Sequence, residues 1–135
     1  MERLFLLLLV CYSSSAFAQD IAGRWTTIND HTGIKTSLIE IKVINGIATG
    51  HVLEIMDKAK QKNRCNKCTD DRKDQPIMGM EIIRNMRKKG AEWSGGTIMD
   101  PATGDVYDCK LWVEDGKLKV RGYVAFFYRT QVWVR

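Results

Sequence analysis

The sequence predicts an all-β fold in which an antiparallel meander of about eight strands closes into a barrel. Apolar and polar residues alternate from Ile39 to Val43 and again from Tyr107 to Val113, a pattern typical of strands with one buried face. Turn signals separate such segments about every ten residues, as they do in all-β domains. The segments do not alternate with helical patterns as in a parallel sheet, so we expect the strands to pair as sequential hairpins.

The turn signals set the expected strand limits. Asn45-Gly46 is a strong two-residue hairpin signal, and residues 29–33, 100–104 and 114–116 combine glycine with other turn-forming residues. Residues 57–76 are expected to form a long polar loop, and residues 77–88 fit either a strand or a short helix. The interior of such a barrel holds either packed side chains or one small ligand. The strands are expected near residues 23–29, 34–43, 47–56, 91–99, 105–113, 117–125 and 127–134.

Residues 1–18 are predicted to be a signal peptide. Arg3 gives a positive start, residues 4–10 form an unbroken apolar run, and Ala16-Phe17-Ala18 matches the small-x-small cleavage rule. The apolar run is too short to span a bilayer as a helix. We therefore expect cleavage after Ala18 and a mature single domain of residues 19–135 that is periplasmic or secreted and does not span a membrane.

The charge balance is basic, with a formal net charge of +5. Such a charge favours contact with anionic surfaces such as lipid headgroups or acidic polysaccharide, and export argues against nucleic acid as a partner. Arg84, Arg87, Lys88 and Lys89 form a basic run. That run is compatible with an envelope-binding surface or, alternatively, with an ordinary solvated face.

Several motifs in a fixed order resemble a family of small exported bacterial proteins of unknown function that are described as lipocalin-like. The resemblance covers residues 21–135 and implies a β-barrel with a possible ligand cavity, but it implies no reaction. The chain departs from the family at Phe127-Tyr128, where a small residue is usual, and at Cys109; the first departure is expected to narrow the barrel mouth. The matching segments are Gly23-Arg24-Trp25, Cys65-Asn66-Lys67-Cys68, and residues 76–80, 93–101, 120–123 and 129–135.

The Gly23-x-Trp25 motif opens the first expected strand. In lipocalin-like barrels such a Trp lies across the closed end, and an Arg from a late strand packs over its ring. Arg121 and Arg129 are the candidates for that contact, which is worth about 0.5–2 kcal/mol. An ordinary core tryptophan is the alternative, and both interpretations are structural rather than catalytic.

The pair Cys65-x-x-Cys68 leaves three interpretations open. A local disulfide suits an oxidising compartment and is favoured. A redox pair would need a thioredoxin-like context, which the sequence lacks. Half of a zinc site would need Cys109, His31 or His51 to complete it. We expect the pair to be bonded within a free polar loop that oxidants can reach, and Cys109, in phase with the apolar set of its strand, to be a buried free thiol.

The last strand gives the candidate ligand-binding residues. Arg129, Gln131 and Trp133 share one face, and Tyr107 belongs to the inward set of its own strand; together they would place a few polar groups in an apolar pocket. Alternatively, Arg129 braces Trp25. The sequence contains no catalytic motif, and we expect no cofactor or metal. The predicted function is binding of a hydrophobic or amphipathic, lipid-like small molecule, with envelope contact or thiol redox chemistry as alternatives.

Overall fold

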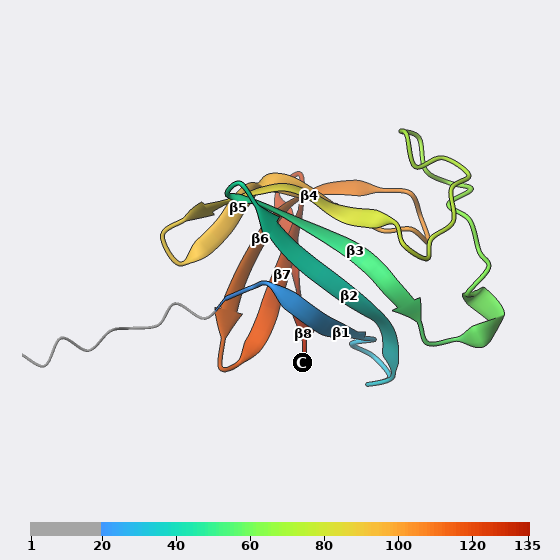
Figure 1. Cartoon of the computed structure of the whole chain (residues 1–135), viewed down its shortest axis with the longest axis horizontal. Coiled ribbons are helices and arrows are strands. Elements are labelled where there is room, and N and C mark those ends of the chain that lie inside the picture. The colour runs from blue at the N-terminus through green and yellow to red at the C-terminus, as the bar shows by residue number, and fades with distance from the viewer. Residues whose placement is uncertain (1–19) are drawn as a thin grey trace, which may run out of the picture.

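Eight antiparallel strands form one sheet in chain order in the computed structural model, which describes residues 20–135. The predicted signal peptide lies outside the described residues. A short 3₁₀ helix, η1 (Lys58–Lys60), follows β3 (Figure 1). The strands are β1 (Gly23–Ile28), β2 (Lys35–Ile44), β3 (Ile47–Ile55), β4 (Glu81–Lys89), β5 (Glu92–Met99), β6 (Val106–Glu114), β7 (Lys117–Val124) and β8 (Phe127–Trp133).

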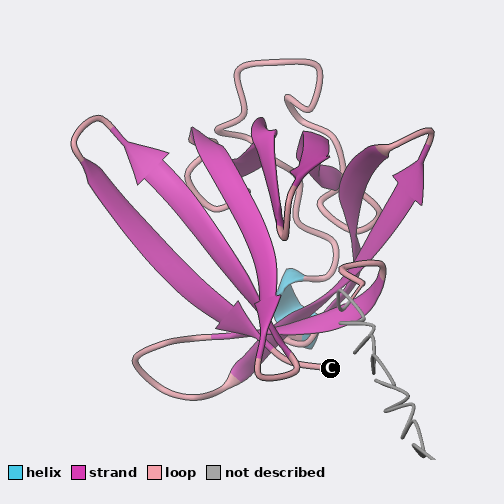
Figure 2. Ribbon diagram, turned by 90° about the vertical axis from the view of Figure 1, so that its left-hand side faces the viewer, coloured by secondary structure: helices cyan, strands magenta, loops and turns pink. Residues whose placement is uncertain are grey.

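The two edge strands meet at one point, which makes the sheet a nearly closed barrel. The amide of Thr26 donates to the carbonyl of Val134 at 2.6 Å, and the amide of Val134 donates to the carbonyl of Thr26 at 3.0 Å. Figure 2 shows the strands converging on one side of the view and spreading apart on the other. The predicted all-β meander of about eight strands that closes into a barrel is confirmed.

The two ends of the barrel differ. The packed end carries the tight turns β2–β3, β4–β5 and β6–β7, together with the C-terminus. The open end carries the β1–β2 turn, the β3–β4 loop of residues 56–80, the β5–β6 turn and the tip of the β7–β8 hairpin. In Figure 1 the β3–β4 loop, in green, lies at the right, and the β4–β5 turn lies at the left.

Trp25 lies at the packed end and is fully buried, and its indole N–H donates to the carbonyl of Ile21 at 2.8 Å. The cation over its ring is Arg135, whose guanidinium carbon is 4.0 Å from the ring centroid. Gly23 has φ +118° and would place a Cβ 3.4 Å from that guanidinium, so a residue without a side chain leaves room for Arg135.

Our prediction that Arg121 or Arg129 packs over Trp25 was therefore wrong. The Thr26–Val134 pair sets Trp25 opposite Arg135 across the barrel seam. Arg121 alternates with the buried Val120 and so points outward. There it stacks on Trp112 and Tyr128, at 4.9 and 4.2 Å from the two ring centroids.

Residues 77–88, which fit either a strand or a helix, contain most of strand β4. The strand is irregular at Asn85, which has φ +58°. Ile83 and Met86 are both buried although they are three residues apart, because the irregularity changes which side chains face inward. This break in the alternation imitated a helical spacing in the sequence.

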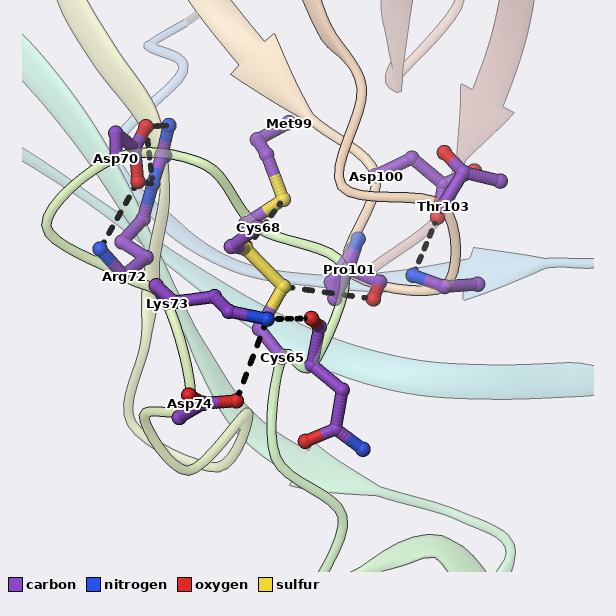
Figure 3. Close-up of a disulfide and its surroundings, with 12 residues drawn as sticks. Cys65, Cys68, Asp70, Arg72, Lys73, Asp74, Met99, Asp100, Pro101 and Thr103 are labelled. Atoms are coloured by element: carbon purple, nitrogen blue, oxygen red, sulfur yellow. Dashed lines mark hydrogen bonds and ion pairs between the residues drawn. A yellow bond between two sulfur atoms is a disulfide. The ribbon is translucent and has the colours of Figure 1, made fainter.

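The β3–β4 loop is folded against the barrel, so our prediction of a free polar loop was wrong. Cys65 and Cys68 are joined by a disulfide with a Cα–Cα distance of 5.4 Å, and both are buried. The Cys65 sulfur lies 3.6 Å from the carbonyl oxygen of Pro101, and the Cys68 sulfur lies 3.7 Å from the thioether sulfur of Met99 (Figure 3). The pair therefore fixes the loop to the β5–β6 turn.

Glycine makes this contact possible. A Cβ on Gly104 would lie 2.1 Å from the carbonyl oxygen of Lys67, and Gly104 has φ +76°. Any other residue at this position would push the loop away from the β5–β6 turn.

Arg72 orders the second half of the loop, although its side chain is charged. It is only 4% exposed and binds the Asp70 carboxylate through Nε and Nη2, at 2.6 Å for the shortest contact. Its Nη1 donates to the carbonyl of Glu81 at 3.0 Å. The hydrogen bond from Arg72 lowers the pKa of Asp70 from 3.8 to about 2. Polar pairing therefore orders a segment that is poor in apolar residues.

Candidate functional site

The inner wall formed by β6, β7 and β8 changes character along the barrel axis. The strand register sets three inward rows. The row at the packed end contains Leu118 and Trp133, which are both buried. In the row nearest the open end, Gly122 is half-buried and Arg129 is exposed. The rows are Val113, Leu118 and Trp133; Leu111, Val120 and Gln131; and Cys109, Gly122 and Arg129. Along β7 and β8 the inward residues thus become more exposed toward the open end, whereas Cys109 on β6 stays buried.

Gly122 lies in the upper wall beside Tyr107 and Ile98. A Cβ at this position would meet the Cβ of Tyr107 at 3.5 Å and a methyl carbon of Ile98 at 3.9 Å, both ordinary contacts. Tyr107 is half-buried, and its hydroxyl donates to the Asp105 carboxylate at 3.3 Å. Burial and the neighbouring Asp105 raise the pKa of Tyr107. The phenol therefore stays neutral and keeps its proton to donate.

Gln131 lies between the floor and the mouth. Its side-chain oxygen accepts the indole N–H of Trp133 at 3.1 Å. Within residues 20–135 its amide nitrogen donates to no protein group, so the two N–H donors remain available. Of the four predicted ligand-binding residues, Trp133 therefore belongs to the floor and Gln131 to the wall above it.

Arg129 lies at the mouth rather than at the floor. Its Nη2 is 2.7 Å from the Asp30 carboxylate in the β1–β2 turn, so the pair joins the last strand to the first turn. The alternative in which Arg129 braces Trp25 is thus excluded, because the two lie at opposite ends of the barrel. Arg129, Gln131 and Tyr107 line the same half of the interior.

A cluster of hydroxyls on the β1–β2 wall was not predicted. The Thr27 Oγ1 is 2.6 Å from the Oγ1 of Thr36 and 2.6 Å from the Oγ of Ser37. Thr27 is nearly buried and continues the inward set that begins with Trp25. Thr36 and Ser37 are consecutive, and both reach Thr27 because the β1–β2 register shifts beside Thr27.

Two depressions flank the open end. One has a volume of about 510 Å³ and is bordered by apolar Ile34, Ile55 and Met56 and by the cations Lys35 and Lys60. The other has a volume of about 440 Å³ and is lined partly by Tyr107 and Tyr123. Tyr128 points outward and so does not narrow the mouth. Phe127 continues the face of Arg129 at the rim and is exposed, so the predicted narrowing of the mouth depends on Phe127 alone.

The groups proposed for zinc or redox chemistry do not come together. In the described part of the chain, no three His, Cys, Asp or Glu side chains are placed to hold a metal ion. His51 lies 3.5 Å from Glu81, and His31 lies in an exposed turn. Cys109 is a buried free thiol inside the barrel, and burial raises its pKa from 9.0 to about 12. The disulfide sulfurs are covered by the β5–β6 turn.

The predicted basic run is divided by the fold. Arg84 is held by Asp71 at 2.8 Å and by Glu81 at 2.7 Å. Arg87, Lys88 and Lys89 are exposed near the β4–β5 turn, at the packed end. The run is thus not a single cationic surface, and its exposed part lies far along the barrel from the open end. Between residues 20 and 135, no helix is long and apolar enough to cross a bilayer.

Eight antiparallel strands in chain order, closed over a packed floor, define a small barrel of the lipocalin-like class. The chain belongs to the bacterial family described as "Uncharacterized protein conserved in bacteria (DUF2147)", which matches residues 23–135. A solved structure from Helicobacter pylori, described as belonging to the lipocalin family, is similar with a TM-score of 0.73 at 15% identity. The similarity covers 86% of this chain and 82% of that one. A comparison with curated proteins gave no match.

Proposed function

We propose that this barrel binds a hydrophobic or amphipathic small molecule in the upper half of its interior, outside the cytoplasm. One observation carries the proposal: the inward rows change from buried Leu118 and Trp133 to accessible Gly122 and Arg129. A mostly apolar pocket with a few placed polar groups is the usual form of a small-molecule site.

The polar groups indicate the class of ligand. Arg129 and the amide of Gln131 are hydrogen-bond donors, and Tyr107 adds a neutral hydroxyl. The Ile98 and Val120 side chains supply apolar wall. This arrangement favours a molecule with an apolar body and a polar or anionic end, such as a fatty acid. Each methylene that leaves water contributes about 0.8 kcal/mol.

The compartment is inferred from two independent features. Residues 1–18 have the pattern of a cleavable export signal, and Cys65 and Cys68 are within disulfide bonding distance. Disulfides persist in oxidising compartments such as the periplasm. Binding rather than catalysis is supported by the similar fold of a solved structure described as belonging to the lipocalin family.

A lumen-filling substitution tests the proposal. Gly122→Leu places an isobutyl group between Tyr107 and Ile98, and Gly122 has no positive φ that would oppose a side chain. We expect this variant to lose most of its binding of a fluorescent polyene fatty acid. The matched control is Lys119→Leu, on the outward face of the same strand. Circular dichroism checks both folds. Equal binding by Gly122→Leu and the wild type would contradict a site in the interior.

A further inference from the structure

Exposed apolar side chains gather at the open end. Of the eight large hydrophobic residues that are exposed in residues 20–135, six belong to that end. They are Ile34, Val106, Val124, Phe126, Phe127 and Tyr128. An exposed apolar group of this kind marks an interaction surface.

The β7–β8 hairpin tip is the centre of this group. Phe126 is 99% exposed and Phe127 is 77% exposed. Val124 pairs with Phe127, so Ala125 and Phe126 form a two-residue turn, and Ala125 has φ +50°. Consecutive phenylalanines at a tight hairpin tip form a convex projection rather than a flat or hollow surface.

The side chains behind the tip are ordered by polarity. Tyr123 and Tyr128 follow the phenylalanines on the outward face, with ring centroids 6.2 Å apart. Arg121 comes next, over the Tyr128 ring. Phenylalanine, then tyrosine, then arginine is the order of side chains from the apolar layer to the headgroups at a bilayer surface. The hairpin is thus suited to shallow insertion into lipid.

The β3–β4 loop adds positive charge at the same end. Residues 57–68 carry five exposed cations and one acid, Asp57. Three acids follow, and each has a basic partner: Arg72 for Asp70, Arg84 for Asp71 and Lys73 for Asp74. Near its tip the β7–β8 hairpin carries Arg121 and Arg129 and no acid, and the acids of the neighbouring turns are Asp30, Asp100 and Asp105. The cations are Lys58, Lys60, Lys62, Arg64 and Lys67.

We propose that the open end docks on an anionic lipid bilayer, with Phe126 and Phe127 inserted and the β3–β4 loop cations on the headgroups. Apolar insertion combined with basic residues is the combination that gives reversible binding to such surfaces. The inference goes beyond ligand binding, since a barrel can hold a ligand without touching a membrane. Docking in this orientation would face the accessible interior toward the lipid.

Vesicle flotation of the mature protein tests the inference. We expect flotation with vesicles of phosphatidylcholine and phosphatidylglycerol at low salt and much less in high salt. Phe126→Asp with Phe127→Asp should lower the partition coefficient about a hundredfold, since burial of each ring is worth about tenfold or more. The matched control is Ile44→Asp, a residue 64% exposed at the packed end, which should float like the wild type.

A second variant tests how much the loop cations contribute to vesicle binding. Lys58→Gln, Lys60→Gln and Lys62→Gln together should lower binding to the anionic vesicles by about tenfold or more and leave binding to phosphatidylcholine alone unchanged. Gly122→Leu should float normally, and the Phe126/Phe127 variant should still bind the fluorescent fatty acid. These two results separate docking from ligand binding.

Three results would overturn the inference. The wild type could remain unbound at low salt, or the Phe126/Phe127 variant could float as well as Ile44→Asp. Alternatively, sedimentation could show a wild-type dimer that the Phe126/Phe127 variant converts to a monomer, with no vesicle binding by either. That last result would assign the tip to a contact between two copies of the chain.

Discussion

The guanidinium of Arg135 lies 4.0 Å from the ring centroid of Trp25, and this contact joins the last residue of the chain to the floor of the barrel. The same side chain donates to the carbonyls of Asp20 and Ala22 at 2.7 and 3.3 Å. The C-terminus therefore closes the packed end and also holds the segment that leads into β1.

Arg135→Ala should destabilise the mature domain by about 1–3 kcal/mol, because a stacked cation and its hydrogen bonds are lost together. The measurement is urea unfolding followed by tryptophan fluorescence. Arg24→Ala is the control. Arg24 is exposed, and its guanidinium lies 3.6 Å from the Glu40 carboxylate; an exposed ion pair of this kind contributes little to stability. Equal unfolding midpoints for the two variants would contradict the structural role of Arg135.

Replacing Cys65 and Cys68 with serine should release the β3–β4 loop and leave the barrel folded. The ring closed by this disulfide is short, so its direct effect on the unfolded chain is small. The larger effect is loss of the buried contact with Met99 and Pro101. Trypsin should therefore cleave the variant faster at the lysines of the loop, whereas Cys109→Ser should not change that rate. Unchanged cleavage would show that the loop is held without the disulfide.

The thiol of Cys109 should be unreactive in the folded protein. Burial raises its pKa from 9.0 to about 12, so the thiolate forms first in the unfolded chain. The stability that Cys109 contributes is complete below pH 9 and is lost as the pH rises from 9.0 to about 12. Alkylation should label Cys109 only after denaturation, and Cys109→Ala should reduce the alkaline loss of stability. Rapid labelling of the folded protein would contradict burial.

Asp70 should make the protein sensitive to acid. Hydrogen bonds from Arg72 hold its pKa at about 2, below the ordinary 3.8. The stability it contributes is therefore present above pH 3.8 and is lost as the pH falls toward 2. Urea unfolding measured at several pH values in this range gives the free energy of unfolding as a function of pH. That free energy should fall less steeply with falling pH for Asp70→Asn than for the wild type. An unchanged slope would assign the acid sensitivity to other carboxylates.

The strands were predictable because their signals are local. Alternation and tight turns such as Asn45-Gly46 reproduce the hairpins. Strand β4 was ambiguous because the irregularity at Asn85 disturbs the period. The β3–β4 loop was mistaken for a free segment because its order depends on distant partners, Met99 and Gly104, and on the pairing of Arg72 with Asp70.

The site was only partly predictable for a similar reason. Alternation placed Arg129, Gln131 and Trp133 on one face, but it could not give their depth along the barrel. The partner of Trp25 depends on the seam between Thr26 and Val134, which joins residues at opposite ends of the chain. Sequence periodicity carries no information about that register.

Binding in the interior is tested most directly by native mass spectrometry of the mature protein purified from its own host. We expect a complex with one lipid-like molecule per chain, and we expect Gly122→Leu purified in the same way to lack it. A wild-type protein that carries no such molecule, or a Gly122→Leu variant that carries the same one, would contradict a ligand site in the upper half of the barrel.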